Sequence, residues 1–473
     1  MNKIDVDVAV IGAGSAGLRA FRAAGKWTNK VVLIEGGQHG TTCARVGCMP
    51  SKLLIAASEA AHASREAPAF GIDTGTVKVD GVAVMNRVRS ERDRFVSFVV
   101  DGVYEIPEEQ RIQGYARFLD NHRLQIEDHT IVNARRIVIA TGSTPSYPGF
   151  LADLGDRMIV NDDVFSWNDL PDSVAIFGPG VIGLELGQAL NRLGVRVLMF
   201  GRGGPVGPLT DPEVLASAQV EFSGEFSLDA DANVKSVSKT DEGVQIDFVS
   251  PGGDTQETTV DYVIAATGRS PSVSRLGLHR TSLPLDADGV PVFDQQTMRI
   301  GQSHVFIAGD VADDRPVLHE AADEGVIAGD NAGRYPDVQS GQRSSPLGIV
   351  FTDPQIAMVG SRYTELADQD IIIGKASFAN QGRSRVMLKN HGLLRVYADA
   401  ENGRFLGAEM LGPRAEHIGH LLAWSHQSQL TIDQMEEMPF YHPVIEEGVR
   451  GAVRDAARQL QERLGNSAKK VAA

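Results

Sequence analysis

Two cysteines are all that this chain of 473 residues contains. So few sulfurs exclude a disulfide-stapled scaffold, and a chain of this length can bury enough apolar surface without one. No apolar stretch reaches about 18 residues, so the sequence predicts no membrane-spanning helix. The first residues are polar and lack the apolar segment of a signal peptide, which makes a reducing cytoplasm the expected location. In that compartment two neighbouring cysteines are expected to do redox work or to bind a metal.

Positive charge is also in short supply. The chain has 45 lysines and arginines against 61 acidic residues, which gives a net charge of −16. Such a chain repels nucleic acid unless a basic patch is strongly localised, and none is visible, so no nucleic-acid partner is expected. Apolar residues make up 42% and charged residues 22% of the sequence, a balance typical of globular proteins. At about 150 residues per domain, the length predicts roughly three domains.

A first glycine turn stands between an apolar strand over 7–12 and a helical pattern that a second strand follows. Its members are Gly12, Gly14, Ser15 and Gly17. Glycine lets the backbone turn tightly against a pyrophosphate, and the start of the helix offers it free N–H groups. Glu35, at the end of the second strand, can accept hydrogen bonds from a ribose. We therefore predict a dinucleotide site at this turn.

A second glycine turn repeats the pattern between a strand over 173–178 and a helix over 181–193. Its glycines are Gly178, Gly180 and Gly183. Two such units imply two nucleotides, and the second is expected to be a nicotinamide. The following strand ends where an acid would stand, but this chain has Gly201 and then Arg202. Arg202 can pair with a 2′-phosphate or simply face solvent, so NAD and NADP both stay open.

Strands and helices alternate through most of the chain, which predicts an α/β fold with parallel sheets. Strands over 136–142 and 262–268 end in Ala-Thr-Gly, as exits from dinucleotide-binding units do, and supply Thr141, Gly142 and Gly268. The stretch 201–211 is rich in glycine and proline and predicts a loop. Beyond about Pro346 we expect a separate domain of alternating strands and two helices, with a frayed tail over 465–473.

Both cysteines, Cys43 and Cys48, lie in the segment between Thr41 and Lys52. A zinc site usually needs four N or S ligands, and no histidine cluster lies nearby, so a metal is not expected. On a regular helix, positions i and i+5 are ~7.5 Å apart along the axis and point to different faces. A bond between the sulfurs therefore requires the helix to be distorted or to begin here, which Gly47 and Pro50 would permit. Inert thiols remain the alternative.

This segment resembles the active-site motif of the class I pyridine nucleotide–disulfide oxidoreductases. Within the family it is most similar to the dihydrolipoyl dehydrogenase motif, Gly-Gly-Thr-Cys-Leu-Asn-Val-Gly-Cys-Ile-Pro-Ser-Lys. The resemblance runs from Asp7 to Arg450, and the motif differs at Thr41, Ala44, Arg45 and Met49. It implies two Rossmann-like dinucleotide-binding domains, for FAD and NAD(P), and an α+β dimerisation domain. The implied boundaries are 1–150 and 276–345 for FAD, 151–275 for NAD(P), and 346–473 for the dimerisation domain.

The resemblance also implies roles for residues. Cys48 would face the flavin as the charge-transfer thiolate, Cys43 would attack the substrate disulfide, and Lys52 would lie near the flavin, paired with Glu185. His442, oriented by Glu447, would move protons at the site of the other subunit, so the homodimer would be obligatory. Pro443 fits the first position of a helix, which makes His442 its expected cap. Further flavin contacts are implied at Thr42, Gly114, Ala116, Asp310, Leu318, His319 and Ala321.

These residues imply dihydrolipoyl dehydrogenase activity, in which a protein-bound dihydrolipoamide is oxidised through the cysteine pair, FAD and a nicotinamide nucleotide. An NADPH-dependent enzyme like glutathione reductase is the first alternative: Arg202 favours it, whereas the segments 50–52 and 317–325 favour the lipoamide branch. A redox-sensing flavoprotein of low turnover is the second, because Arg45 puts a bulky cation between the cysteines. Mercuric reductases and large thioredoxin reductases need additional cysteines near the C-terminus, which this chain lacks. The presence of both active-site cysteines argues against a soluble transhydrogenase.

Overall fold

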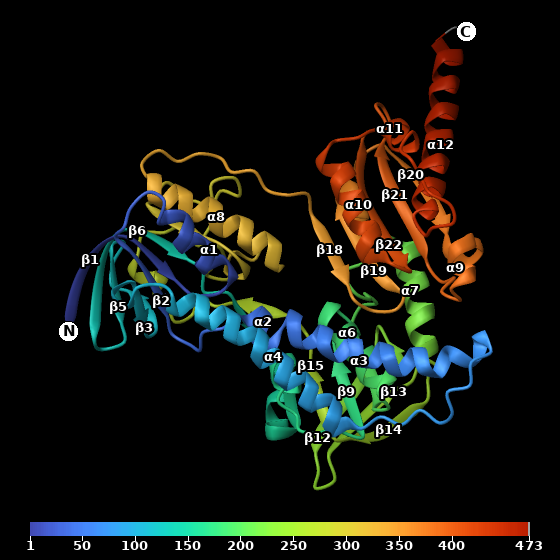
Figure 1. Ribbon diagram of the computed structural model, residues 1–473, viewed down its shortest axis with the longest axis horizontal. Helices are drawn as coiled ribbons and strands as arrows, with labels where there is room; N and C mark the ends of the chain where they lie inside the picture. Colours follow the sequence, from blue (N-terminus) through green and yellow to red (C-terminus); the bar gives the residue numbers. More distant parts are fainter. Residues whose placement is uncertain (472–473) are drawn as a thin grey trace.

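The computed structural model describes residues 1–471 and arranges them in three lobes (Figure 1). The N-terminal lobe is built on a sheet of order β3-β2-β1-β6-β5-β4, and β17 also pairs with β6. Its strands are β1 (Asn2–Ile11), β2 (Val31–Glu35), β3 (Arg111–Gln113), β4 (Ala116–Phe118), β5 (Arg123–Ile126), β6 (Thr130–Ile139) and β17 (Val305–Ile307). The first strand starts earlier than its apolar residues indicate, because residues 2–5 pair with residues 130–133 of β6. The parallel sheet predicted from the sequence is confirmed for β1, β2, β3, β6 and β17.

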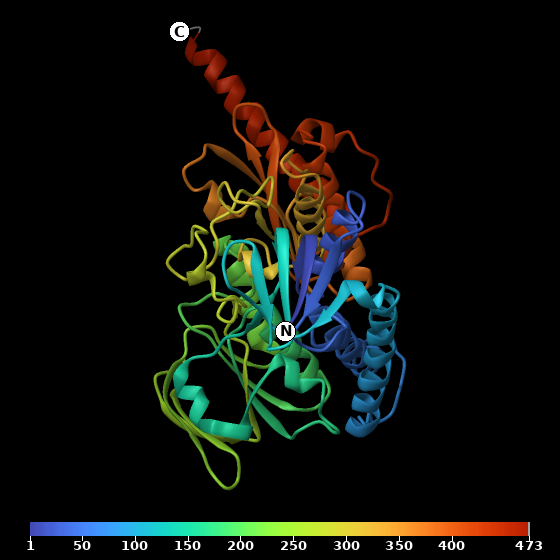
Figure 2. The ribbon, with the colours of Figure 1, turned by 90° about the vertical axis from the view of Figure 1, so that its left-hand side faces the viewer.

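Two helices, α1 (Ser15–Ala24) and α8 (Leu318–Arg334), pack together in this lobe (Figure 2). Glycines on α8 allow the backbones to approach closely. A Cβ atom on Gly325 would lie 2.3 Å from the carbonyl oxygen of Ala16, and one on Gly329 would lie 2.3 Å from that of Ala20. The residues after position 304 therefore join the first glycine turn, although the middle lobe separates them in sequence.

Three helices lead from the N-terminal lobe along the middle one (Figure 1): α2 (Thr42–Val46), α3 (Cys48–Glu66) and α4 (Gly81–Tyr104). The α3 helix contacts both α4 and α6. Leu54 of α3 and Met85 of α4 are fully buried in one apolar cluster with Leu186 and Leu190 of α6. This cluster fixes the helix that begins at Cys48 against the second nucleotide-binding unit.

The middle lobe holds a parallel sheet of order β11-β10-β9-β15-β8 and an antiparallel sheet of order β12-β13-β14. Its strands are β8 (Met158–Val160), β9 (Ser173–Phe177), β10 (Arg196–Phe200), β11 (Ser227–Asp229), β12 (Asn233–Lys239), β13 (Val244–Val249), β14 (Thr255–Val260) and β15 (Tyr262–Ala265). Its helices are α5 (Asn161–Val164), α6 (Val181–Arg192) and α7 (Pro212–Glu225). Where the N-terminal and middle lobes meet, β7 (Ser143–Pro145) pairs with β16 (Arg269–Pro271).

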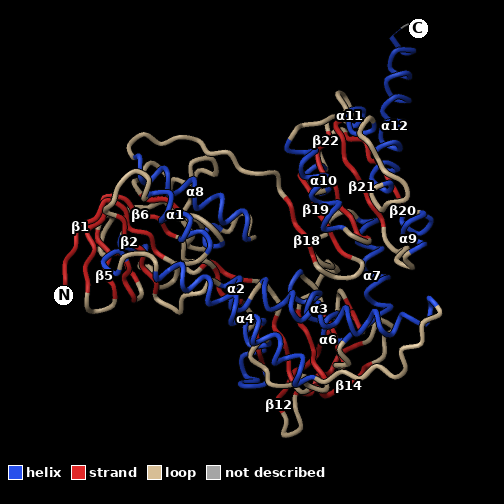
Figure 3. The backbone as a smooth tube through the Cα atoms, in the orientation of Figure 1, coloured by secondary structure: helices blue, strands red, loops and turns tan. Residues whose placement is uncertain are grey.

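The C-terminal lobe is one antiparallel sheet of order β18-β19-β22-β21-β20 with helices against it (Figure 3). Its strands are β18 (Leu347–Val350), β19 (Gln355–Gly360), β20 (Ile371–Ser377), β21 (Leu393–Asp399) and β22 (Phe405–Gly412). The expectation of two helices was wrong, since the described residues form α9 (Gly382–Val386), α10 (Ala415–Gln427), α11 (Ile432–Glu436) and α12 (Glu447–Val471). The two additional helices, α9 and α11, have five residues each, too short to show apolar periodicity.

Both ends of α12 differ from the prediction. The expected frayed tail is helical up to Val471, and residues 472 and 473 lie outside the described part. The helix begins at Glu447, so Pro443 is not its first residue and His442 is not its cap. Glu447 accepts a hydrogen bond from the backbone N–H of Val444, at 3.2 Å, which ties the preceding loop to the start of the helix.

Short 3-10 helices complete the chain. They are Ala67–Phe70, Glu108–Gln110, Gly149–Arg157, Leu278–Arg280, Asp310–Ala312, Tyr363–Leu366 and Phe378–Asn380. Within residues 1–471, no helix combines the length and the apolar content that crossing a bilayer requires.

Candidate active site

The first glycine turn has the shape that a bound pyrophosphate needs. Gly12 has φ +107°, and a Cβ there would lie 2.2 Å from the carbonyl oxygen of Ala140. A Cβ on Gly17 would lie 1.8 Å from the carbonyl oxygen of Gly12, so glycine is required where β1 meets α1. A Cβ on Gly14 would meet nothing within 4 Å. The start of α1, where Ser15 is the first helical residue, thus leaves open space for a phosphate group.

Glu35 closes this turn. One carboxylate oxygen accepts the backbone N–H of Ala13 at 2.7 Å, and the other accepts that of Gly37 at 2.7 Å. The carbonyl group of Glu35 accepts the N–H of Gly114, whose φ of +139° favours glycine. Ala116, two residues further on, is buried in β4. A carboxylate oxygen carries further lone pairs, so Glu35 can hold the turn and still accept a ribose hydroxyl.

Asp310 lies at the junction of the N-terminal and middle lobes. One of its oxygens accepts a hydrogen bond from the Ser143 hydroxyl at 2.8 Å. Ser143 in turn accepts one from Nε of Arg269 at 2.8 Å. The preceding residues also bridge the lobes, because the Thr141 hydroxyl donates to the carbonyl oxygen of Ser272 and Gly142, with φ +67°, accepts the N–H of the same residue. Ser143 and Arg269 were not predicted, although they directly follow the Ala-Thr-Gly motifs.

The start of α8 is open to solvent. Leu318 and His319 are exposed, whereas Glu320 and Ala321 behind them are buried. Free N–H groups at a helix start can receive a negatively polarised ring edge. Because α8 packs on α1, this exposed end belongs to the same lobe as the first glycine turn. The start of α8 and the first glycine turn thus fit the set of residues that would hold a flavin nucleotide.

The second glycine turn has the same backbone geometry as the first. Gly178 has φ +104°, and a Cβ there would lie 2.4 Å from the carbonyl oxygen of Ala266. A Cβ on Gly183 would lie 2.0 Å from the carbonyl oxygen of Gly178, whereas one on Gly180 would meet nothing within 4 Å. Gly268, with φ +121°, also faces open space. The second glycine turn therefore also has the shape and the open space that a bound dinucleotide needs, here in the middle lobe.

The end of β10 differs from that of β2. A Cβ on Gly201 would lie 2.4 Å from the carbonyl oxygen of Ala230, so no acidic side chain fits at this strand end. Arg202 is exposed and has no hydrogen bond or ion pair to any residue in the described chain. Asp231 accepts the backbone N–H of Gly203, the residue after Arg202, at 2.6 Å. Arg202 is thus available to a ligand bound at this edge.

The two cysteines stand on either side of a helix break. Cys43 is the second residue of α2 and Cys48 the first of α3, and Gly47 between them leaves helical geometry with φ −124° and ψ −116°. This confirms the expected distortion. Both cysteines are free thiols in this structure, Cys43 half-buried and Cys48 exposed. The break places them where their side chains form a hydrogen bond.

That hydrogen bond makes the thiols unequal. The pKa of Cys48 is lowered to about 7, mainly by donation from Cys43 and also by the positive charge of Lys52, against the effect of burial. The same hydrogen bond, together with burial, raises the pKa of Cys43 well above its usual range. At pH 7 about half of Cys48 is therefore the thiolate, and more of it above that pH, whereas Cys43 stays the thiol.

Lys52 is held in place from two other lobes. Its Nζ atom donates to both carboxylate oxygens of Glu185 on α6, at 2.9 and 2.8 Å, and Glu185 is only 4% exposed. The Nζ atom also lies 4.5 Å from the ring centroid of Phe351, and the backbone N–H of Phe351 donates to Glu185 at 3.0 Å. Phe351 directly follows β18 of the C-terminal lobe and was missed in the sequence, where no local pattern marks it.

The Arg45 guanidinium group contacts the backbone of Gln38. Its Nη1 atom lies 3.4 Å from the carbonyl oxygen of Gln38, and the Cδ atom of Arg45 would lie 3.0 Å from a Cβ on Gly40. Thr41 is the N-cap of α2 with φ +58°, a value uncommon for a β-branched residue, and its hydroxyl accepts the N–H of Ala44 at 3.2 Å. Thr42 follows as the first helical residue and is exposed.

The expected pair of His442 and Glu447 is formed. His442 Nδ1 lies 3.1 and 3.2 Å from the carboxylate oxygens of Glu447, and the hydrogen bond to the histidine lowers the pKa of that carboxyl. The His442 side chain is 80% exposed, and its hydrogen bonds within the described chain are to Glu447 alone. Within the described chain, no hydrogen bond therefore links His442 to either cysteine.

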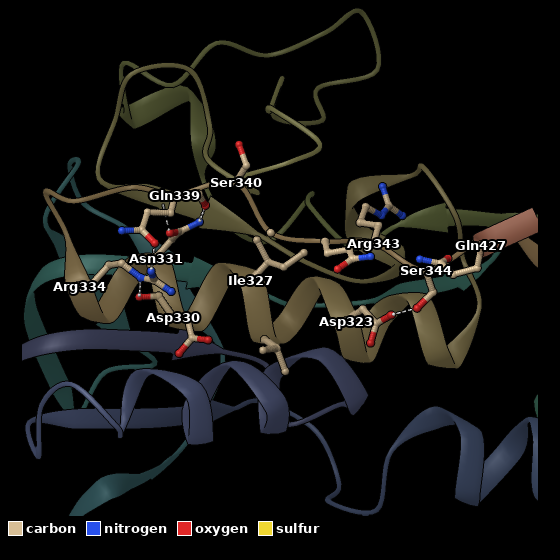
Figure 4. Close-up of a pocket in the computed structure, with 13 residues that line it drawn as sticks. Asp323, Ile327, Asp330, Asn331, Arg334, Gln339, Ser340, Arg343, Ser344 and Gln427 are labelled. Atoms are coloured by element: carbon tan, nitrogen blue, oxygen red, sulfur yellow. Dashed lines mark hydrogen bonds between the residues drawn. The ribbon is translucent and has the colours of Figure 1, made fainter. Parts of the chain in front are cut away.

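A cavity of about 480 Å³ lies elsewhere, between α8 and the connector to the C-terminal lobe, which is the segment 335–346 (Figure 4). None of the predicted site residues lines it. Among its lining residues, the Asn331 side chain donates to the backbone carbonyl oxygen of Gln339, and the Ser344 hydroxyl donates to Asp323. Within the described residues, no group of three or more His, Cys, Asp or Glu side chains could hold a metal ion.

Residues 6–325 match the family described as pyridine nucleotide-disulphide oxidoreductase, and residues 347–453 match its dimerisation domain. The chain belongs to this family of FAD- and NAD(H)-dependent oxidoreductases, which act through a redox-active disulfide.

Its relatives include dihydrolipoyl dehydrogenases. That of Bacillus subtilis is 28% identical over 457 residues, covering 94% of this chain and 97% of that protein. Dihydrolipoyl dehydrogenase 3 of Pseudomonas aeruginosa is 29% identical over 466 residues, covering 95% and 97%. Two structures share the fold: LpdA from Mycobacterium tuberculosis (TM-score 0.81, 23% identity, 95% and 99% covered) and the HOCl-induced flavoprotein disulfide reductase RclA from Escherichia coli (0.79, 20%, 95% and 99%). These matches confirm the predicted family and fold.

Proposed function

We propose that this chain is a dihydrolipoyl dehydrogenase, which oxidises a protein-bound dihydrolipoamide to lipoamide and reduces a nicotinamide nucleotide. The observation that carries the proposal is the unequal thiol pair at Cys43 and Cys48, with Lys52 beside it. A dithiol substrate needs a disulfide with one sulfur that accepts attack and one that leaves as a stable thiolate. The curated relatives named dihydrolipoyl dehydrogenase support the choice of substrate.

The exchange chemistry follows from the two pKa values. A substrate thiolate attacks the Cys43 sulfur, the bond between the cysteines breaks, and Cys48 leaves as the thiolate with the lowered pKa. The second substrate thiolate then attacks the substrate's own sulfur in the mixed disulfide, the bond to Cys43 breaks, Cys43 leaves as a thiolate, and cyclic lipoamide is released. Cys43 then takes a proton and donates its hydrogen bond to Cys48. The pair has gained two electrons, and bound FAD supplies the route by which they reach the nicotinamide.

In this proposal, proton transfer at the cysteines depends on an acid–base group from the partner subunit. The thiol of Cys43 has a raised pKa, so its deprotonation and reprotonation require a neighbouring acid–base group. His442 of the partner subunit, oriented by Glu447 of the partner subunit, is the group we assign. The match to a dimerisation domain supports this arrangement. A homodimer with two shared sites is therefore the proposed active form.

The main test is a steady-state comparison of dihydrolipoamide and reduced glutathione as donors, each with NAD⁺ and NADP⁺. A dihydrolipoyl dehydrogenase turns over dihydrolipoamide at least a hundredfold faster than glutathione. Equal or faster reaction with glutathione would contradict the proposal. Turnover of neither donor by protein that carries FAD would favour the low-turnover redox sensor.

The alternative is an NADPH-dependent disulfide reductase, and one observation favours it. The end of β10 has no room for the acid that would bind a ribose diol, whereas the exposed Arg202 can pair with a 2′-phosphate. Phosphate recognition concerns the nucleotide only and leaves the thiol substrate undecided. The donor comparison described above, run with both nucleotides, separates the two questions.

A further inference from the structure

A buried cluster of charges lies behind the start of α8 and has no part in the chemistry described above. Its two glutamates, Glu320 and Glu324, are 1% exposed and stand one helical turn apart. Arg343, on the connector to the C-terminal lobe, pairs with Glu320 at 3.0 Å, with Glu324 at 2.7 Å and with Asp314 at 2.5 Å. Arg315 pairs with Glu320 from the other side, at 3.2 Å. Burying this many charges costs free energy, so a specific use for them is expected.

Glu324 makes one contact that reaches the flavin-binding elements. Its second oxygen accepts the backbone N–H of Gly309 at 2.7 Å. Gly309 has φ +82°, which favours glycine, and a Cβ there would lie 2.9 Å from Cβ of Ala16 on α1. The next residue is Asp310, for which the family resemblance implied a flavin contact. One carboxylate thus holds the turn that both presents Asp310 and packs against the helix of the first glycine turn.

We propose that Glu324 is a positioning residue for the flavin: its ionised carboxylate, paired with Arg343, fixes the turn that carries Asp310. A hydrogen bond to an ionised acceptor is about twice as strong as one to a neutral acceptor, so the clamp loosens when Glu324 is neutral. The proposal rests on the flavin site assigned above.

The charges around Glu324 make the clamp sensitive to pH. The pKa of Glu324 is raised to about 7, mainly by burial and also by the negative charges of Asp314 and Glu320, against the effect of the Gly309 N–H and of Arg343. Above pH 7 the carboxylate is ionised and the turn is held. Below pH 7 it gains a proton and the turn is released. Flavin is therefore expected to bind more tightly on the alkaline side of neutrality.

The experiment measures the rate at which the holoenzyme releases FAD, from the rise in flavin fluorescence after dilution, at pH 8 and pH 6. Glu324→Gln keeps the shape and removes the charge, so at pH 8 release should be about tenfold faster than in the wild type. At pH 6 the two rates should converge, because the wild-type carboxyl is then mostly protonated. Equal rates at pH 8, or a tenfold gap that persists at pH 6, would overturn the proposal.

Asp323→Asn is the matched control. Asp323 precedes Glu324 on the same helix and lies at the edge of the cavity next to Arg343, where it accepts a hydrogen bond from Ser344 (Figure 4). The substitution removes an equal charge without touching Gly309, so the release rate should not change. An equal acceleration in this variant would show a general charge effect and contradict the clamp.

Stability separates positioning from a structural role. The pKa of Glu324 is higher in the folded chain than in the unfolded chain, so ionisation of Glu324 lowers the free energy of unfolding, although the ionised form holds the Gly309 turn more firmly. Glu324→Gln should therefore not lower the thermal unfolding midpoint of the flavin-free protein. A large drop in both the midpoint and flavin retention would overturn the positioning role. If the variant does not fold, a flat pH profile of wild-type release between pH 6 and 8 would do the same. Wild-type protein without FAD would instead overturn the proposed function.

Discussion

The hydrogen bond from Cys43 should set the acidity of Cys48, and two variants of Cys43 test this. Donation from Cys43 is the largest cause of the fall in the Cys48 pKa from 9.0 to about 7. Cys43→Ala removes the donor, so the pKa should rise toward 9. Cys43→Ser keeps a donor, because the serine hydroxyl can replace the thiol, and the pKa should stay near 7.

The size of the effect is large at ordinary pH. At pH 7.5 a group of pKa 7 is about three-quarters ionised, whereas a group of pKa 9 is about 3% ionised, a difference of about 25-fold. Either variant contains a single cysteine, because the chain has only two. The rate of alkylation by iodoacetamide as a function of pH therefore reports on Cys48 alone.

The result that would refute the reasoning is one pKa shared by both variants. If both titrate near 7, Lys52 rather than the thiol sets the acidity. If both titrate near 9, neither the hydrogen bond nor Lys52 lowers it. Lys52→Met in the Cys43→Ser background isolates the contribution of the ammonium and should raise the Cys48 pKa by less than the Cys43→Ala change does, since the Lys52 charge is the smaller effect.

Three further predictions follow from the contacts around the site. Arg202→Glu should raise the KM for NADPH about tenfold or more and change that for NADH little; equal effects would remove the phosphate role. Phe351→Leu should raise the Cys48 pKa by about half a unit, through loss of the contact with Lys52, whereas Phe351→Tyr should leave it unchanged. His442→Gln should lower dihydrolipoamide turnover by about 10²–10⁴-fold, and hybrid dimers with Cys43→Ser chains should regain activity from one intact site; no recovery would contradict a site shared between subunits.

The features that sequence predicted well are those decided by neighbouring residues. A glycine turn between a strand and a helix is set by local backbone conformation and close contacts, as at Gly12 and Gly178, where a Cβ has no room. The helix break at Gly47 followed from the spacing of the cysteines and the reach of a disulfide. The family resemblance then extended these local signals to the whole chain.

The features that sequence missed depend on residues far apart in the chain. Phe351 of the C-terminal lobe contacts Lys52 of α3, about 300 positions earlier in the chain. Arg343 pairs with Glu324 from a segment without regular structure. Neither pattern is periodic, so no local rule identifies them. The start of α12 was misplaced because a proline such as Pro443 also fits a loop. The hydrogen bond from the Val444 N–H to the Glu447 side chain, which holds this loop, has no pattern in the sequence.

Counting thiols during reduction tests the central claim most directly. The oxidised yellow holoenzyme, unfolded under acid conditions, should show no free thiol, and after anaerobic addition of one equivalent of NADH per chain it should show two. A long-wavelength band from the thiolate next to the flavin should appear at the same stage. Loss of the yellow flavin absorbance with the thiol count still at zero would contradict the account, because Cys43 and Cys48 would then not carry the electrons.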